Sequence, residues 1–238
     1  MKNTAELKAE AKEILRGKWG KAVVLNLIPT LLGVAVVIVI ILSGLIGFYL
    51  HGSDGGMFSS VSEQQQTTTN SWGTNIVSSI ISALFLSGIS WTYLDLLRGE
   101  RDQIDPFKDA FRGFQGKFIG GVILLALLTS IFTTLWSLLL VIPGIVKHYS
   151  YSQSYFIYYD QIEQTGEKPK ILDTITASRR LMDGHKGRLF WLDITFIGWY
   201  LLTIPTLGIA YLWVGPYVSA TKAAFYNDLQ NNLRKESI

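Results

Sequence analysis

One short phrase occurs three times in this chain, each time directly before a long apolar segment. The copies are Leu15–Lys21, Phe111–Lys117 and Met182–Arg188, and all follow the pattern apolar-x-Gly-x-x-Gly-Lys/Arg. A fixed phrase at equivalent places indicates a repeated structural unit, and such a repeat determines the architecture. We therefore predict one domain over residues 1–238, built from three pseudo-repeats at 1–99, 100–163 and 164–238.

The composition indicates that the repeated units lie in a membrane. Charged residues make up 16% of the chain and hydrophobic residues 49%, whereas soluble domains carry about 25% charged residues. The apolar run 22–50 exceeds the apolar region of a signal peptide, about 7–15 residues long, and is expected to stay as a first span. The net charge of +3 is explained by basic flanks of membrane spans, so no nucleic-acid partner is expected.

The distribution of basic residues predicts how the chain crosses the membrane. The loop 51–73 contains no lysine or arginine and is expected outside, whereas the basic segments 98–117 and 161–188 are expected inside. The predicted fold class is all-α, a polytopic transmembrane helical bundle of about six spans arranged as three hairpins, with both termini cytoplasmic. The spans are placed at 22–50, 74–97, 118–140, 143–160, 189–204 and 209–227, with a reversal at Pro143-Gly144.

A basic amphipathic helix is predicted before each hairpin, at residues 4–16, 105–114 and 170–183. Asn3 and Glu6 have the spacing of a capping box at the start of the first helix. These helices are expected on the inner leaflet, where each Lys or Arg near anionic lipid contributes about 1 kcal/mol. The alternative is that their charges only orient the spans.

The repeated glycine phrase is interpreted as a bend at the membrane surface. The first glycine would end the surface helix, and the basic residue would anchor the next span among lipid headgroups. A specific site for anionic lipid is the alternative. A nucleotide-binding loop is excluded because no strand precedes the phrase and no Ser or Thr follows the basic residue. The candidate anchors are Gly17, Gly20, Lys21, Gly113, Gly116, Lys117, Gly184, Gly187 and Arg188.

The even-numbered spans share a Tyr-x-Asp ending at the inner face. The tyrosines are interpreted as anchors of the aromatic belt and the aspartates as solvated boundary residues. Cation binding or capping of a neighbouring helix is the alternative. The residues are Tyr93, Asp95, Tyr158, Asp160, Tyr226 and Asp228.

Three charges fall inside predicted spans, namely Lys147, Asp193 and Lys222. Such charges cost about 2.5–3.5 kcal/mol at the centre of a span and are functional candidates by default. Asp193 and Lys222 lie at similar depth, so we predict an ion pair that ties one hairpin together. Extension of the charges to the headgroups and a transport role are the alternatives. Lys147 is expected near the outer end of its span.

No enzyme signature is present, and no catalytic residue, metal or cofactor is predicted. The chain has no cysteine, and its three histidines lie far apart, which excludes thiol catalysis and the usual zinc-ligand spacings. The sequence also lacks Gly-x-Ser-x-Gly and His-Glu-x-x-His.

Longer phrases along nearly the whole chain resemble a known family. They are Leu15–Lys21, Leu94–Gly99 with Phe111–Gly113, Trp136–Lys147, Ser178–Phe190, Phe196–Trp199 and Pro216-Tyr217. The chain resembles the integral membrane proteins of Gram-positive bacteria classed as domain of unknown function 975. This resemblance implies a multi-span protein of the bacterial cytoplasmic membrane and supplies no activity.

Two classes of function remain open from the sequence. The favoured class is a non-enzymatic, membrane-embedded binding or organising protein of the cell envelope. Its expected partners are anionic headgroups of the inner leaflet and a membrane protein or a second copy of the chain. The alternative is a small transporter or channel with a site near Lys147, Asp193 and Lys222.

Overall fold

The computed structural model describes residues 1–51, 70–206 and 208–236, and this part of the chain is all-helical, as predicted. Most of the polar loop expected outside, at 51–73, falls outside the described residues. The helices are α1 (Thr4–Leu15), α2 (Trp19–His51), α4 (Asn70–Arg98), α5 (Pro106–Ala110), the 3₁₀ helix η1 (Arg112–Phe114), α6 (Ile119–Leu139), α7 (Val141–Tyr151), α8 (Ser154–Thr165), α9 (Ile171–Leu181), α10 (Lys186–Ile194), α11 (Ile197–Thr203) and α12 (Tyr211–Glu236).

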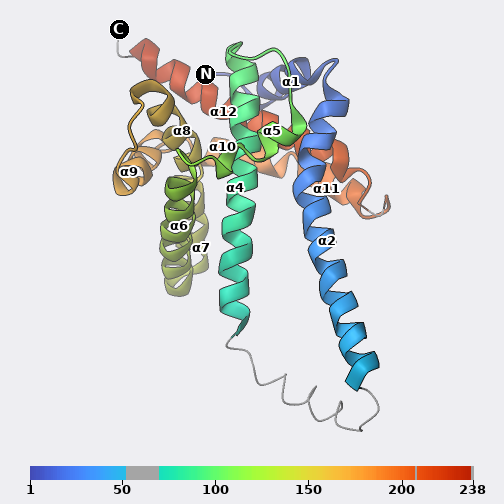
Figure 1. The fold of residues 1–238 in the computed structure, drawn as a ribbon. Coiled ribbons are helices and arrows are strands. Elements are labelled where there is room, and N and C mark those ends of the chain that lie inside the picture. Colours follow the sequence, from blue (N-terminus) through green and yellow to red (C-terminus); the bar gives the residue numbers. More distant parts are fainter. Residues whose placement is uncertain (52–69, 207, 237–238) are drawn as a thin grey trace.

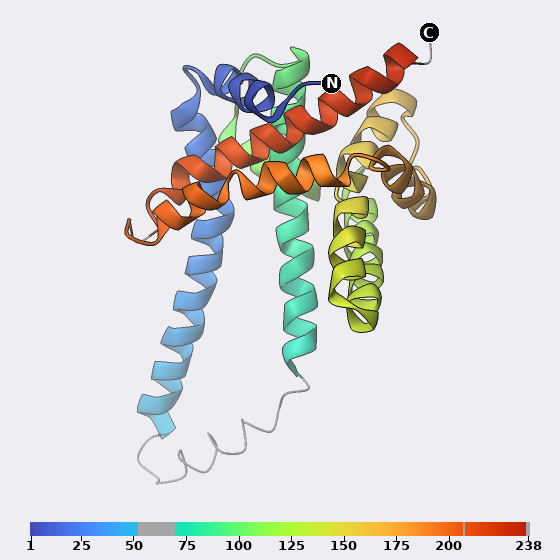
Figure 2. The ribbon, with the colours of Figure 1, turned by 180° about the vertical axis from the view of Figure 1, so that it is seen from behind.

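The buried core lies at one end of the molecule, in what we call the packed layer. This layer consists of α1, α5, η1, α8, α9, α10, α11 and α12 with the adjoining ends of α2, α4 and α6. Helix α12 crosses the upper ends of α2 and α4, and α1 lies against it (Figure 1). Every residue of the apolar core cluster falls within 7–28, 84–125 or 151–229. Both termini lie on the side of this layer (Figure 2).

The remaining parts of the long helices extend away from the packed layer and form what we call the protruding region. It comprises residues 31–51 of α2, 70–82 of α4 and the α6–α7 hairpin over 130–147 (Figures 1 and 2). Its described side chains are mostly aliphatic and exposed, including Leu31, Val39, Leu45, Val77, Leu138 and Ile142. Among the described residues, the fold therefore buries apolar side chains in the packed layer and leaves many of those in the protruding region uncovered by protein.

Two helical segments in the described residues are long and apolar enough to cross a membrane. They are Ile76–Arg98 in α4 and Ile119–Leu139 in α6, and α2 contains a shorter apolar segment, Trp19–Ala35. The later predicted spans look different. Predicted span four is divided into α7 and α8, and predicted span five into α10 and α11. Helices α10, α11 and α12 run across α2 and α4 instead of beside them (Figure 2).

The reversal between α6 and α7 occurs at Leu140, which has extended backbone angles, and not at Pro143-Gly144 as predicted. Pro143 instead lies in the first turn of α7. The N–H groups of a first turn have no acceptor within the helix, so proline loses no hydrogen bond there. Gly144 permits close packing of the hairpin, because a Cβ there would lie 2.2 Å from Ser137 Oγ. The Pro-Gly pair therefore starts the second helix of the hairpin and does not form its turn.

The break between α7 and α8 is stabilised by side chains from neighbouring helices. Ser178 Oγ donates to the Ser150 carbonyl at 2.8 Å, and Trp91 Nε1 donates to the Tyr155 carbonyl at 3.0 Å. The carbonyl of Ser150, in the last turn of α7, has no partner within its own helix and needs one when it is buried. Helix α9 thus stabilises the end of α7, and the contact from Trp91 fixes the start of α8 against α4.

The first and third amphipathic helices form as α1 and α9, whereas the second, predicted over 105–114, is divided into the short helices α5 and η1. The apolar face of the first is not available to lipid. The predicted capping box between Asn3 and Glu6 is present at the start of α1. Leu7, Ala11 and Leu15 are buried within the packed layer, where α1 lies against α12. The expectation of a lipid-facing stripe is therefore wrong for α1, because α12 covers it.

Candidate functional site

The first glycine of each repeated phrase has one of two structural roles. Gly17 and Gly184 both have φ +74, the left-handed conformation that follows the end of α1 and of α9. Glycine adopts this conformation at little cost, as predicted for a residue that ends a surface helix. Gly113 instead packs on α4, where a Cβ would lie 2.0 Å from the Leu84 carbonyl oxygen. The second glycines, Gly20, Gly116 and Gly187, have space for a side chain, and packing does not explain them.

The basic residue that ends each phrase contacts a later segment. Lys21 Nζ donates to Gln103 Oε1 at 3.3 Å, and Lys117 Nζ to Glu163 Oε1 at 2.6 Å. Arg188 Nη2 lies 3.0 Å from Asp228 Oδ2 and 2.7 Å from the Lys2 carbonyl. Lys21 and Lys117 keep the exposure that headgroup contact needs, whereas Arg188 is committed to contacts within the protein.

The aspartates of the three Tyr-x-Asp motifs are buried, so the prediction that they are solvated is wrong. Asp95, Asp160 and Asp228 are 2%, 6% and 5% exposed. A buried carboxylate must be paired to be tolerated, and each of the three pairs with an arginine. Arg112 Nη1 lies 2.6 Å from Asp95 Oδ2, Arg98 binds both oxygens of Asp160 at 2.6 and 2.8 Å, and Arg188 binds Asp228.

Tyrosine hydroxyls complete two of these pairs. Tyr159 donates to Asp95 Oδ1 at 2.8 Å, and Tyr226 donates to Asp160 Oδ2 at 2.6 Å. Because Tyr226 belongs to the third repeat and Asp160 to the second, the motifs of different repeats are joined. We call the six residues Asp95, Asp160, Asp228, Arg98, Arg112 and Arg188 the Arg–Asp lock.

The motif tyrosines are core residues and not anchors of an aromatic belt. Tyr93, Tyr158 and Tyr226 have no exposed surface. Tyr93 accepts a hydrogen bond from Asn26 Nδ2 at 2.7 Å. Tyr158 packs against Gly121, where a Cβ would lie 1.9 Å from the ring. The belt interpretation fails because α12 and its neighbours cover this level of the molecule.

Hydrogen bonds and ion pairs favour the charged forms of Asp228 and Arg112. Burial opposes the negative charge of Asp228, but hydrogen bonds from Arg188 and the Lys2 amide outweigh it and lower the pKa of Asp228. Burial likewise opposes the positive charge of Arg112, yet Asp95 and Tyr159 raise the pKa of Arg112. The partners of these two side chains therefore stabilise their charges more than burial destabilises them.

The predicted pair between Asp193 and Lys222 is confirmed. Lys222 Nζ lies 3.1 Å from Asp193 Oδ1 and joins α12 to α10, and the Tyr149 hydroxyl donates to Asp193 Oδ2 at 3.2 Å. Lys147 does not join this group. Its Nζ lies 4.5 Å from the centre of the Trp136 ring, a cation–π contact between α7 and α6. The structure therefore separates the three predicted intramembrane charges into a pair and a single lysine.

A groove of about 620 Å³, which we call the serine groove, lies beside the Asp193–Lys222 pair and was not predicted from the sequence. The run of serines along α4 is the feature of the sequence that could have indicated it. Lys222 of α12 lines the groove together with residues from α2, α4, the α7–α8 junction and α11. The serines that line it are Ser78, Ser79, Ser82, Ser87, Ser90, Ser152 and Ser219.

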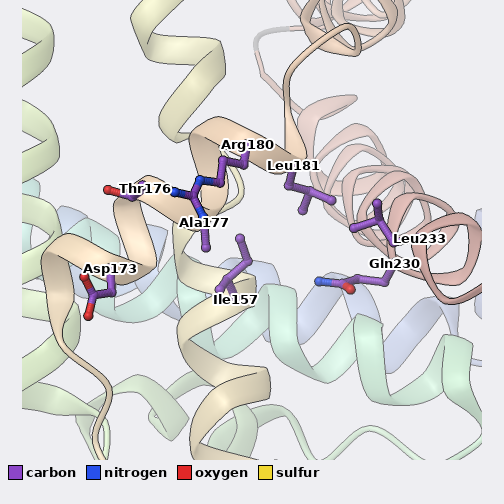
Figure 3. Close-up of a pocket in the computed structure, with 8 residues that line it drawn as sticks. All are labelled: Ile157, Asp173, Thr176, Ala177, Arg180, Leu181, Gln230 and Leu233. Atoms are coloured by element: carbon purple, nitrogen blue, oxygen red, sulfur yellow. The ribbon is translucent and has the colours of Figure 1, made fainter. Parts of the chain in front are cut away.

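Further hollows lie in the packed layer, and two of them border the end of α12 or the lock. One, of about 460 Å³, lies between α8, α9 and the end of α12, and Gln230 points across it towards Ile157 (Figure 3). The other surrounds the Arg98–Asp160 pair and carries both acidic and basic residues. Within the described residues, no group of three or more His, Asp or Glu side chains is placed to hold a metal ion.

Comparison with known proteins adds a family and no activity. A family model described as "Protein of unknown function (DUF975)" matches residues 1–146 and 138–233. No curated protein and no solved structure gives a significant match. Because the two matched segments together cover almost the whole chain, this protein belongs to the DUF975 family of proteins of unknown function.

Proposed function

We propose that this protein is a non-enzymatic binding and organising protein of the bacterial cytoplasmic membrane, with both termini inside. The observation that carries the proposal is the protruding region, whose exposed side chains are aliphatic on several helices at once. Contiguous apolar surface of this extent is rare on soluble monomers. The hydrocarbon chains of lipids would cover this apolar surface and keep it out of water.

The dimensions of α2 support the same conclusion. Residues 31–51 of this helix are about 30 Å long, from a rise of about 1.5 Å per residue. The hydrocarbon core of a bilayer is also about 30 Å thick. The protruding part of α2 thus matches the thickness of a membrane, and the packed layer would lie towards its inner face.

We further propose that α2, α4, α6 and the α7–α8 pair cross the membrane. An even number of crossings places both termini on one side, which agrees with their position in Figure 1. Helices α10, α11 and the start of α12 would then lie at the inner interface. Their exposed Trp199, Tyr200 and Trp213 side chains suit the headgroup region. The six-span bundle is the alternative arrangement.

The packed layer supports binding and organisation more than chemistry. The charged side chains of the Arg–Asp lock pair with one another, and these pairs hold α4, α8, α12 and the chain around η1 together. The exposed Lys21 and Lys117 remain available for anionic headgroups, each contributing about 1 kcal/mol. A partner membrane protein, or a second copy of this chain, is the other class of partner that we propose.

A small transporter is a second candidate, and one observation favours it. The Asp193–Lys222 pair borders the serine groove, and two helices are broken nearby, between α7 and α8 and between α10 and α11. Discontinuous helices around a polar site are common in transporters. Flux measurements separate the two candidates.

Cysteine labelling tests the proposed topology, because the chain has no native cysteine. Single cysteines would replace Ser62, Thr206 and Glu167 in turn, and intact cells would be treated with an impermeant thiol reagent. Glu167 lies on the exposed surface of the packed layer, between α8 and α9. We expect labelling at position 62 alone. Labelling at both 62 and 206 would establish six spans and contradict the interfacial placement of α10–α12. Labelling at 167 would contradict the inside placement of the packed layer.

Reconstitution tests the proposed activity. Wild-type protein and the variants Asp193→Asn and Lys222→Met would be placed in liposomes and assayed with a panel of ions and metabolites. We expect no flux from any of them. Flux that is lost in both variants would overturn the organising function in favour of transport.

A further inference from the structure

We propose that the serine groove binds the uncharged, hydroxyl-bearing headgroup of a membrane amphiphile, of the acylglycerol or glycosylated acylglycerol class. This proposal rests on the membrane placement described above. It adds a specific ligand class to a site that neither the family match nor the repeated motifs identify.

Hydroxyl groups from several helices line the groove. Ser82 and Ser90 come from α4, Ser219 from α12, and two tyrosines from α11 and α12 complete the set, namely Tyr200 and Tyr211. A hydroxyl both donates and accepts hydrogen bonds. A wall of hydroxyls is therefore complementary to a ligand whose groups also do both, as the hydroxyls of glycerol and sugars do.

Asn26 contributes a fixed acceptor to the same groove. Its amide nitrogen donates to the Ala22 carbonyl at 3.0 Å and to the Tyr93 hydroxyl at 2.7 Å. These two bonds set the orientation of the side-chain amide, so the oxygen is directed away from them. Asn26 Oδ1 lies 3.7 Å from the position of a Cβ on Gly215, on the wall where α2 and α12 meet.

The charge of the groove argues against an anionic headgroup. Lys222 is its only charged lining residue among those described, and Asp193 neutralises it at 3.1 Å. The Tyr149 hydroxyl further holds Asp193 in place. A phosphate would have to compete with this carboxylate for Lys222, whereas a neutral headgroup can use the remaining ammonium donors.

The size and position of the groove suit an amphiphile. Its volume of about 620 Å³ falls in the range of about 300–1,000 Å³ typical of small-molecule sites. A transmembrane helix, with a diameter of about 10 Å and a length of about 30 Å, is too large for it. Between Ser78 and Ser90 the groove follows α4 for about 18 Å, from the protruding region into the packed layer.

Apolar surface continues from the groove in the direction of the protruding region. Ser79 also borders a second groove, of about 520 Å³, lined mainly by aliphatic residues of α4 and α6. A chain that leaves the serine groove can therefore follow apolar helix surface. The headgroup would be held at the packed layer and the acyl chains among the protruding helices.

Native mass spectrometry of the full chain in a neutral detergent tests the proposal. The probes are monoglucosyl dioleoylglycerol and dioleoyl phosphatidylglycerol, which share their acyl chains and differ in the headgroup. Ser82→Phe and Gly215→Leu would fill the groove from α4 and from α12. A Cβ atom added at Gly215 would lie at ordinary van der Waals distances from its nearest neighbours, so the backbone need not move. Ile81→Phe is the control, because Ile81 is 45% exposed and does not line the groove.

We expect the glucosyl lipid adduct to fall at least five-fold in both groove variants and to be unchanged in Ile81→Phe. Phosphatidylglycerol adducts should be the same in all proteins. Equal glucosyl lipid binding by wild type and both groove variants would overturn the proposal. Groove-dependent binding of phosphatidylglycerol alone would overturn the uncharged class.

The membrane proposal is judged separately from the ligand proposal. Cysteine labelling can support the topology even where groove variants bind lipid normally, in which case only the ligand assignment fails. Melting temperatures of Ser82→Phe and Gly215→Leu, compared with Ile81→Phe, show whether a lost adduct reflects the groove or a damaged fold.

Discussion

The packed layer and the protruding region share the same long helices, but apolar side chains are buried in the packed layer and exposed in the protruding region. Along α2, Leu25 is fully buried, whereas Leu42 is 51% exposed. In α4 the core begins at Leu84, and Val77, less than two turns earlier, is exposed. A single helix therefore runs from the protein interior to an apolar surface whose exposure to water would be unfavourable.

The polar groups follow the same division. The Arg–Asp lock lies in the packed layer, and each of its three carboxylates is paired with an arginine. The described part of the protruding region has no ion pair. The difference shows that the layer is held by internal packing and charge pairing, while the protruding helices depend on their surroundings. Each variant below tests one side of this comparison against the other.

Removal of a lock carboxylate should have the largest effect. Asp160→Asn leaves Arg98 without its bidentate partner in a mostly buried position. Breaking such a pair from one side costs about 3–5 kcal/mol. Denaturant or thermal unfolding in detergent micelles measures the loss.

Asp183→Asn is the matched control for Asp160→Asn. Asp183 pairs with Lys186 at 3.4 Å, but its side chain is largely exposed, so we expect a loss of about 0–1 kcal/mol. Equal stability of the two variants would mean that the lock does not hold the layer together.

Truncation of a leucine at each end of α2 should give the second largest difference in stability between the two regions. Leu25→Ala creates a cavity in the core, with an expected loss of about 2–5 kcal/mol. Leu42→Ala removes contacts with detergent or lipid only, and we expect a change within about 0.5 kcal/mol. A comparable loss for Leu42→Ala in micelles would indicate that protein covers the protruding region, for example a second copy of the chain.

Substitution of glycines within one repeated phrase gives a smaller contrast. A Cβ at Gly113 would lie 2.0 Å from the Leu84 carbonyl oxygen, whereas a Cβ at Gly116 would meet nothing within 4 Å. We expect Gly113→Ala to lose about 1–3 kcal/mol through overpacking and Gly116→Ala to remain close to wild type in the same unfolding assay. A stable Gly113→Ala would show that η1 can move away from α4 at little cost.

Acid should produce the smallest and most local effect, at Asp228. The folded-state pKa of this carboxyl is lowered from the ordinary value of 3.8. Its contribution to stability is therefore fully present above that value and is lost as pH falls through the lower, folded-state pKa. The difference in melting temperature between wild type and Asp228→Asn should narrow only at pH below about 3.8. Narrowing that is complete at higher pH would contradict the lowered pKa.

Some roles of the residues in the repeated phrase could be predicted from the sequence, and others could not. The phrase correctly identified Gly17 and Gly184 as residues that end helices, because that role depends on local backbone conformation. It could not separate Gly113 from them, because its constraint comes from α4, which is distant in the chain. The similar depth assigned to Asp193 and Lys222 did predict their pair.

The Tyr-x-Asp motif shows the opposite outcome. Recurrence identified the residues, but the expected solvation of Asp95, Asp160 and Asp228 was wrong. All three partners lie in other helices. Arg112 of η1 binds the aspartate of α4, Arg98 of α4 binds that of α8, and Arg188 of α10 binds that of α12. A sequence gives the depth of such a carboxylate only relative to its own helix, and it does not reveal which helix will cover it.

The sequence by itself determined the all-helical class, the capping box of α1, the helix-ending glycines Gly17 and Gly184, and the apolar runs of α4 and α6 that are long enough to cross a membrane. These follow from local composition, periodicity and backbone preference, which neighbouring residues set. Only the tertiary structure decided that α12 crosses the other helices, that the aspartates pair with arginines, and that a serine-lined groove opens beside Lys222. Those features depend on contacts between segments distant in the chain, where the burial of one helix is decided by the position of another.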